Sequence, residues 1–262
     1  MSRPSPTTTA LRSVRPGPVF LGLVAAMAAG AVLLWQSGAE YRSATAILGT
    51  ILFVLAGWVV SLCLHEFAHA FTAFRYGDRD TELRGYLTLN PLKYSHPGLS
   101  IGLPLLIIAM GGIGFPGGAV YLNTWNFTPR QRTTVALAGP AANLVLGIAL
   151  LLPVGLIDAT PQSRNLLGAV AMLGFLQITA TVLNLIPMPG FDGYNALEPH
   201  LDRSTRASAA KIAPYGFLII FALLLIPALN SAFFDLIYAI TGLFGVDRLP
   251  IAWGWTTFLF WR

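Results

Sequence analysis

The chain has 262 residues, of which 55% are hydrophobic and only 10% are charged. Soluble domains carry about 25% charged residues, so this composition excludes an ordinary soluble protein and predicts one that crosses a membrane several times. The formal net charge of +5 does not indicate nucleic acid as a partner, because the basic residues of membrane proteins gather in cytoplasmic loops.

The N-terminal segment, residues 1–17, is basic and rich in Pro, Ser and Thr, and we expect a disordered tail. An apolar run, Val19–Trp35, follows it. A cleaved signal peptide is the alternative interpretation, but the apolar core of a signal peptide has only about 7–15 residues. We therefore predict a retained first transmembrane helix, which with its outer loop covers residues 18–43.

Apolar windows recur along the whole chain, without an internal repeat. They cover about residues 18–36, 44–74, 99–113, 133–157, 165–187, 212–229 and 231–246. The third window is too short to span, because a transmembrane helix needs roughly 20 residues. We expect it to be re-entrant, and we expect the other six windows to cross.

The basic residues test this number of crossings, because Lys and Arg concentrate on the cytoplasmic side of a membrane. With a cytoplasmic N-terminus and a third window that does not cross, the cytoplasmic segments hold Arg3, Arg12, Arg15, Arg75, Arg79, Arg84, Lys93, Arg130, Arg132, Arg203, Arg206, Lys211, Arg248 and Arg262. Only Arg42 and Arg164 then lie outside. The bias predicts six transmembrane helices with both termini in the cytoplasm.

Residues 78–96 differ from their apolar surroundings. Their charges, β-forming residues and Asn-Pro and His-Pro steps predict a short strand or hairpin at the cytoplasmic face. The segment Gly117–Asn123 is a second candidate strand, with glycines that allow close approach of another backbone. The predicted fold class is an all-α polytopic membrane protein with about six transmembrane helices, a re-entrant segment and a small β element on the cytoplasmic side.

The second window contains His65, Glu66 and His69 in the spacing H-E-x-x-H. Residues four apart on a helix share one face, so the two imidazoles can bind one divalent ion, with zinc the default choice, and the glutamate can act as general base on a water at that ion. The alternative is a buried, hydrogen-bonded histidine pair, which leaves a carboxylate at membrane depth without a cation. Cys63, the single cysteine, excludes an intramolecular disulfide and is expected to be a core residue.

A hydrolytic zinc site usually has three protein ligands, so a third must come from elsewhere in the chain. The candidates include His96, His200, Asp78, Asp80, Glu82, Asp158, Asp192, Glu198, Asp202, Asp235 and Asp247. His65 comes about 30 Å along a helix that runs inward, which puts the metal near the cytoplasmic edge of the hydrocarbon core. Asp158 lies in the outer loop, on the wrong side.

Asp192 fits best, because it ends the fifth span in the broken segment NLIPMPGFDG, residues 184–193. Irregular backbone is tolerated at that depth where protein buries it or where it lines a cavity. An ordinary turn aspartate, as in many Asp-Gly pairs, is the alternative interpretation.

These motifs together resemble the site-2 protease family of intramembrane zinc metalloproteases, in particular its short bacterial members without a PDZ or CBS domain. HEFAH at 65–69 and NLIPMPGFDG at 184–193 carry the resemblance. AGPAANLVLG at 138–147 is similar to the family's Gly-Pro-x-x-Asn segment, and GYLTLNPL at 85–92 to its cytosolic β element. The resemblance covers about residues 44–198.

The resemblance implies a role for each matching residue. His65, His69 and Asp192 would bind one Zn²⁺, and Glu66 would be the catalytic base. Asn184 would help to hold the substrate or its oxyanion, and Asn143 would be a structural or substrate-side residue. The implied substrate is a transmembrane helix of another protein, cut within or at the edge of the bilayer.

We expect Gly117 and Gly118 to bind substrate, because an unwound segment could add to the edge of the candidate strand there. Two positions depart from the family's pattern. The Asp-Gly pair continues with Tyr194 rather than Gly, and His96 stands where an acidic residue is common. His96 is either a loop residue at the membrane face or a pH-sensitive neighbour of the site, and His200 is expected to be solvated.

Two other functions remain as alternatives: an ion or solute transporter that uses the buried polar groups, and a catalytically inactive membrane scaffold. The predicted location is the plasma membrane, with the active site near the cytoplasmic side and with lipid and a transmembrane substrate as partners. The predicted domains are the tail 1–17, the first span 18–43, the protease core 44–198, the C-terminal helices 199–246 and the C-terminal tail 247–262.

Overall fold

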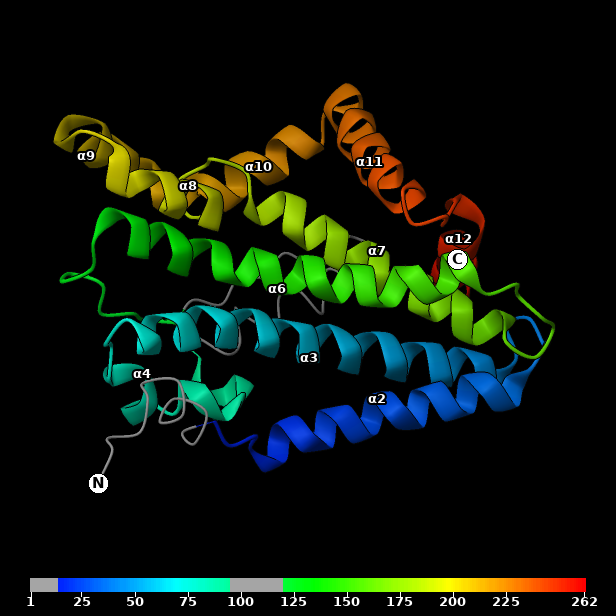
Figure 1. The fold of residues 1–262 in the computed structure, drawn as a ribbon. Coiled ribbons are helices and arrows are strands. Elements are labelled where there is room, and N and C mark those ends of the chain that lie inside the picture. Colours follow the sequence, from blue (N-terminus) through cyan, green and yellow to red (C-terminus); the bar gives the residue numbers. More distant parts are fainter. Residues whose placement is uncertain (1–13, 95–119) are drawn as a thin grey trace.

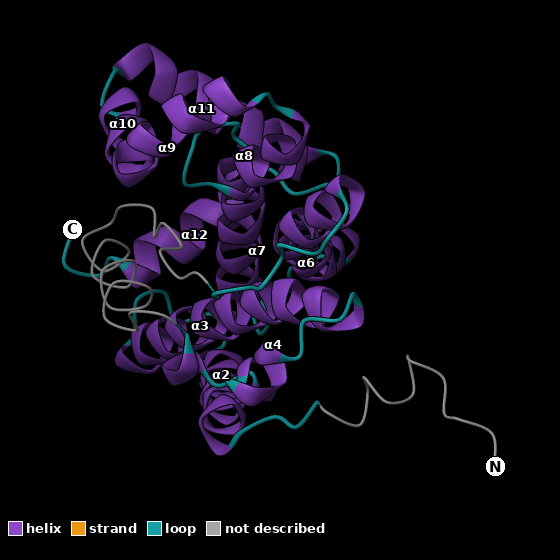
Figure 2. Cartoon of the chain, turned by 90° about the vertical axis from the view of Figure 1, so that its left-hand side faces the viewer, coloured by secondary structure: helices purple, strands orange, loops and turns teal. Residues whose placement is uncertain are grey.

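A computed structural model describes residues 14–94 and 120–262 of the chain. Throughout these residues the regular structure is helical, and Figure 2 shows helices and loops only. Four long helices lie side by side as a bundle (Figure 1): α2 (Pro18–Ser37), α3 (Ala44–Arg75), α6 (Pro129–Leu156) and α7 (Arg164–Asn184). By length and composition, these four and the run Arg203–Leu224 are the described helices able to cross a membrane.

Local sequence defines where the long helices begin. The Ser43 hydroxyl accepts a hydrogen bond from the Ala46 amide at the start of α3. Thr128 and Gln131 form a reciprocal capping box at the start of α6. Small residues then bring neighbouring helices together: a Cβ on Gly30 of α2 would lie 2.6 Å from the Phe53 nitrogen of α3. Such close approach is typical of helix packing in membranes.

The site-bearing ends of α3 and α6 lie together, because the Nδ1 atom of His69 is 2.7 Å from the carbonyl oxygen of Val135. The chain therefore leaves α3 and enters α6 at the same end of the bundle (Figure 1). The expected re-entrant window 99–113 lies outside the described residues. The described residues on either side of it, at the end of α3 and at the start of α6, lie at the same end of the bundle.

The predicted β element is wrong for residues 78–94. They form short helical turns: α4 (Asp80–Leu83), η1 (Tyr86–Thr88) and η2 (Pro91–Lys93). Side-chain oxygens favour these turns over a strand, since Asp78 accepts from the Asp80 amide and Asn90 accepts from the Leu92 amide.

The second candidate strand, Gly117–Asn123, is described only from Val120 onward and is not part of a sheet there. Its backbone amides bond to side chains instead. Val120 donates to Glu66, and Asn123 donates to Asp78 at 2.8 Å.

The two windows expected as the last two spans form two shorter helices that together lead from one end of the bundle to the other, and only the run Arg203–Leu224 in this region is long and apolar enough to cross by itself. Gly216, at the start of α10 (Gly216–Leu224), packs against Pro189 just beyond α7. Phe244, just after α11 (Pro227–Gly242), packs against Gly155 near the far end of α6. Pro227 begins α11 after an extended Ile226 and separates the two helices. Figure 1 shows α11 at a steep angle to α10, and the two helices together lead from near α8 to α12 without returning along the bundle.

The expectation that both termini lie on the cytoplasmic side stays a prediction, but the described ends of the chain lie far apart. The Gly17 amide donates to the Thr88 carbonyl at one end of α2. Arg42, beyond the other end of α2, donates to the carbonyls of Phe260 and Arg262. A 20-residue helix is about 30 Å long, so Gly17 and the C-terminus lie at opposite ends of the bundle (Figure 1).

The C-terminal segment, expected as a tail, contains the helix α12 (Arg248–Phe258). It packs against the first turns of α7, where Gly254 approaches Gly168 closely. The indole nitrogen of Trp253 donates to the side-chain oxygen of Asn165 at 2.8 Å.

Candidate metal centre

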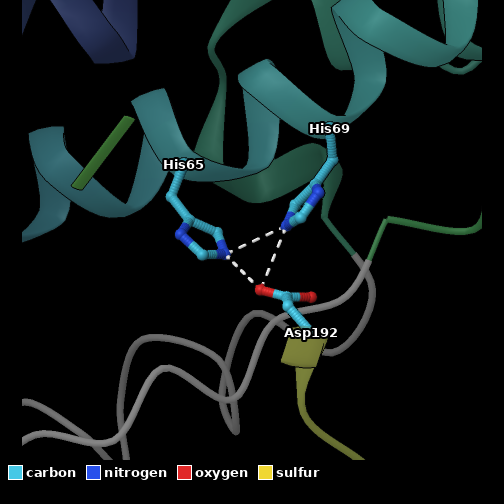
Figure 3. A group of neighbouring side chains, drawn as sticks. All are labelled: His65, His69 and Asp192. Atoms are coloured by element: carbon cyan, nitrogen blue, oxygen red, sulfur yellow. Dashed lines mark hydrogen bonds and ion pairs between the residues drawn. The ribbon is translucent and has the colours of Figure 1, made fainter. Parts of the chain in front are cut away.

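Three potential ligands converge at one end of the bundle (Figure 3). His65 and His69 lie one turn apart on α3, and Asp192 begins α8 (Asp192–Leu197). The Nε2 atoms of the two histidines are 3.1 Å apart, and they lie 3.2 and 3.3 Å from the same Asp192 oxygen. The i, i+4 spacing thus puts both imidazoles on one face as predicted.

The break after α7 is what brings Asp192 to the histidines. Pro187 and Pro189 lack the amide hydrogen that a continuing helix requires. Gly190 has φ +102°, a conformation that residues with a side chain rarely adopt. The chain therefore turns and starts α8 at the level of His65, with Asp192 in its first turn.

The arrangement fits a small divalent ion. The three donor atoms all lie within 4.8 Å of one another. Nitrogen and oxygen donors about 2.0–2.1 Å from a tetrahedral zinc ion lie roughly 3.4 Å apart, close to the distances here. Two imidazole nitrogens and one carboxylate oxygen are also a common donor set for catalytic zinc.

Burial makes the cluster hard to explain without a cation. The exposed fraction is 3% for His65 and 6% for His69, and the Asp192 side chain is 16% exposed. Burial opposes ionisation of Asp192, but the nearby His69 and His65 outweigh this effect and hold the pKa of the Asp192 carboxyl below its usual range. The carboxylate is therefore ready to bind a metal.

Neighbouring groups orient one of the two histidines. The Nδ1–H group of His69 donates to the backbone carbonyl of Val135, which leaves Nε2 free to face a metal. Metal-binding histidines almost always have such an outer partner. The Nδ1 atom of His65 is buried and has no hydrogen-bond partner among the described residues.

Gly139 of α6 is a site residue that the sequence analysis did not single out. A Cβ there would lie 2.2 Å from Nε2 of His69 and 2.6 Å from Nε2 of His65. Any side chain would therefore occupy the space in front of the metal-binding nitrogens. The signal was available, since Gly139 is four residues before Asn143 and shares its helix face.

The predicted catalytic and substrate-side residues lie around this cluster. Glu66 is 2% exposed, and its Oε2 atom accepts a hydrogen bond of 3.2 Å from the Val120 amide. Asn143 on α6 and Asn184 at the end of α7 are also buried. The Oδ1 atom of Asn143 and the Nδ2 atom of Asn184 have no partner in the described part of the chain.

Other predicted positions lie elsewhere. Gly117, Gly118 and His96 are outside the described residues. His200 is not part of the metal cluster; its Nε2 atom lies 3.0 Å from the Thr133 hydroxyl near the start of α6. Cys63 is buried, as expected for a core residue.

Comparison with known proteins reveals close relatives over almost the whole chain. A protein named "Putative zinc metalloprotease Rip2" from Mycolicibacterium smegmatis is 54% identical over 95% of this chain and 96% of its own length. Its namesake from Mycobacterium tuberculosis is 50% identical over 95% of each chain. "Putative zinc metalloprotease YwhC" from Bacillus subtilis is 30% identical over 64% of this chain and 78% of its own length.

Two further comparisons, with family models and with solved structures, give no match. The two Rip2 proteins are nevertheless similar over 95% of this chain, and the names of the three relatives agree with the His65–His69–Asp192 cluster, which could hold a metal ion. This chain belongs to the site-2 protease-like family of zinc metalloproteases.

Proposed function

We propose that the protein is a zinc-dependent intramembrane endopeptidase that hydrolyses peptide bonds in transmembrane segments of other proteins. The observation that carries this proposal is the convergence of His65 and His69 with Asp192, from helices far apart in sequence, beside a buried Glu66. The helix that bears the histidines is long and apolar enough to cross a membrane.

In this proposal His65, His69 and Asp192 hold the metal, which when bound makes a water more acidic and polarises the substrate carbonyl. Glu66 takes a proton from the attacking water and gives it to the departing amide nitrogen, as general base and then general acid. The Nδ2 group of Asn184 is a buried donor without a partner. It is therefore free to hydrogen-bond the substrate carbonyl oxygen as negative charge develops there.

We place the active site near the cytoplasmic side of the plasma membrane. The start of α2, the end of α3 with the turns after it, the start of α6 and α9 (Arg203–Ile212) lie toward the end that bears the metal centre (Figure 1). These segments carry ten of the described basic residues: Arg15, Arg75, Arg79, Arg84, Lys93, Arg130, Arg132, Arg203, Arg206 and Lys211. The segments at the other end, which are the loop after α2, the start of α7 and α12 with the residues after it, carry four: Arg42, Arg164, Arg248 and Arg262. The positive-inside rule then assigns the metal-bearing end to the cytoplasm.

Comparison of the wild type with Glu66→Gln tests the proposal. Both would be analysed for bound zinc and reconstituted with a single-span substrate protein. Glu66→Gln should retain zinc and lose at least about 100-fold in cleavage rate, since a general base contributes 10²–10⁴-fold. Glu82→Gln, which changes an exposed acid outside the site, is the matched control. Cleavage by Glu66→Gln at the wild-type rate would refute the protease assignment.

We also propose that the substrate, once unwound, binds alongside residues 117–123. Val120 donates its amide to Glu66, so a segment lying there would be next to the base. Strand addition of this kind uses main-chain hydrogen bonds and tolerates many sequences. Replacing Gly117 and Gly118 by Val should slow cleavage and leave zinc content unchanged. Unaltered turnover in the reconstituted assay would exclude this binding mode.

A further inference from the structure

A small cavity lies beside His65 between α3, α6 and α7. Its volume is about 10 Å³, and its lining includes Trp58, Leu62 and the polar side chains of Ser61, His65, Asn143 and Gln177. A single water molecule needs at least about 10–15 Å³ of such space and two to four polar partners. The cavity is therefore just large enough for one water, and polar side chains form part of its lining.

Two of the lining side chains have complementary polar atoms without partners. The Nδ1 atom of His65 and the Oδ1 atom of Asn143 are both buried and unpaired in the described residues. When Nε2 of His65, which faces Asp192 and His69, binds the proposed metal, Nδ1 carries the ring hydrogen and is the donor. The residues that line the cavity thus include an unpaired donor on α3 and an unpaired acceptor on α6, which one water could link.

Gln177 supplies the third polar group. It lies within the apolar helix α7, is 2% exposed, and lines the same cavity. An amide at this depth is costly unless it is hydrogen-bonded. Its side chain can both donate and accept, so it can bond to a water in either orientation.

We propose that this cavity holds one ordered water that accepts a hydrogen bond from Nδ1 of His65 and donates one to Oδ1 of Asn143. Gln177 makes the third hydrogen bond to the water. The water does for His65 what the Val135 carbonyl does for His69: it selects the tautomer and fixes the ring so that Nε2 faces the metal. Gln177 is then a positioning residue for a metal ligand, although it does not touch the metal.

This inference rests on the proposed zinc site. It predicts that Gln177→Met weakens zinc binding more than Gln177→Ala does. In Gln177→Met the new side chain fills a similar volume but makes no hydrogen bonds. The water therefore loses a partner, and the ring of His65 is no longer held in its orientation. In Gln177→Ala the vacated space can admit a second water that replaces the amide. A role in packing alone predicts the opposite order, because a cavity is worse than a similar-sized apolar side chain.

The test measures the zinc affinity of the full-length protein in detergent by competition with a chelator. Gln177→Met should weaken affinity by roughly 10–100-fold, as is usual for loss of an outer partner of a metal ligand, and Gln177→Ala should weaken it much less. The visible absorption of the Co²⁺-loaded protein should change in Gln177→Met. Gln177→Leu serves as a second apolar variant if Gln177→Met does not fold.

Thr179→Val is the matched control, because Thr179 is buried on the same helix and its hydroxyl bonds within that helix to Phe175. It should bind zinc as the wild type does. The water site would be overturned if all residue 177 variants had the same zinc affinity, or if Gln177→Ala bound zinc more weakly than Gln177→Met. Either result would leave the protease proposal standing. A wild-type protein that binds no zinc would overturn both.

Discussion

The space in front of the two histidines is kept open by a residue without a side chain. Gly139 lies on the face of α6 that covers Nε2 of His65 and Nε2 of His69. The same face carries Val135, whose carbonyl orients His69, and Asn143, which lines the cavity beside His65. One helix face thus leaves room for the ion and also contacts its ligands.

A methyl group at Gly139 should therefore block the metal centre. Gly139→Ala places a carbon at van der Waals overlap with both Nε2 atoms, and we expect zinc affinity to fall by roughly 100-fold or more, beyond the usual effect of changing a ligand's outer partner. Chelator competition on the purified protein measures this. Gly22→Ala is the control, because nothing lies within 4 Å of a Cβ added there. Wild-type zinc binding by Gly139→Ala would contradict the described approach of α6.

Most of the residues that form the metal centre could be predicted from the sequence. The spacing of His65 and His69 defines their common face, and the broken segment before Asp192 indicates that its chain is not a continuing helix. Gly139 belongs to the Gly-Pro-x-x-Asn segment, but the reason for a glycine there, the close approach of α6 to the histidines of α3, is visible only in the structure. Gln177 likewise became meaningful only once its neighbours across the helices were known.

Among the elements, α12 packs against the start of α7 and is also hydrogen-bonded to it through a buried amide. The side-chain nitrogen of Asn165 on α7 donates to the Ser37 hydroxyl and to the carbonyls of Gly38 and Glu40. Its oxygen accepts from the indole of Trp253. Asn165 therefore links three separate parts of the chain, the end of α2, the start of α7 and α12, at the end opposite the metal.

Asn165→Ala should lower the free energy of unfolding by about 2 kcal/mol, because interhelical hydrogen bonds in membranes are worth roughly 0.6 kcal/mol each and buried partners remain unsatisfied. Denaturant titration in micelles measures this loss. Zinc affinity should not change, since the metal centre lies at the other end. In the control Asn230→Ala only one local bond, to the Leu224 carbonyl, is lost. A stability equal to the wild type would show that the linkage contributes little.

Hydropathy predicted α2, α3, α6 and α7 well, because each must be apolar over nearly its whole length. It could not define the path after Gly216. An apolar run interrupted at Pro227 is compatible with two antiparallel spans or with one bent passage, and packing against Pro189 and Gly155 decides between them. The strand predicted near residue 85 failed because Asx turns at Asp78 and Asn90 satisfy the backbone locally.

For the whole molecule, the path of the chain after Gly216 places the C-terminus at the end of the bundle opposite the start of α2. The metal centre, the α4 region and the start of α2 share one end, and α12 shares the other with the loop between α2 and α3 (Figure 1). A sequence-based count of six spans would place the two termini together. The two arrangements differ in the side of the membrane on which Asp247 would lie.

Cysteine labelling in intact cells distinguishes these arrangements, because Cys63 is the single cysteine of the chain and is buried. Cysteines introduced at the exposed positions Glu82, Asp158 and Asp247 would be tested with a membrane-impermeant thiol reagent. We expect Asp158→Cys and Asp247→Cys to react and Glu82→Cys to react only after the cells are opened. Protection of Asp247→Cys together with Glu82→Cys would instead support six spans.

The distance in sequence between the histidines and Asp192 also has a consequence for biosynthesis. A ribosome translates His65 and His69 more than a hundred residues before Asp192. During that interval the nascent chain holds only two of the three ligands, and α7 has not yet turned back toward them. The protein therefore passes through most of its membrane insertion with an incomplete ligand set, and the group of three potential ligands is assembled only late in its own synthesis.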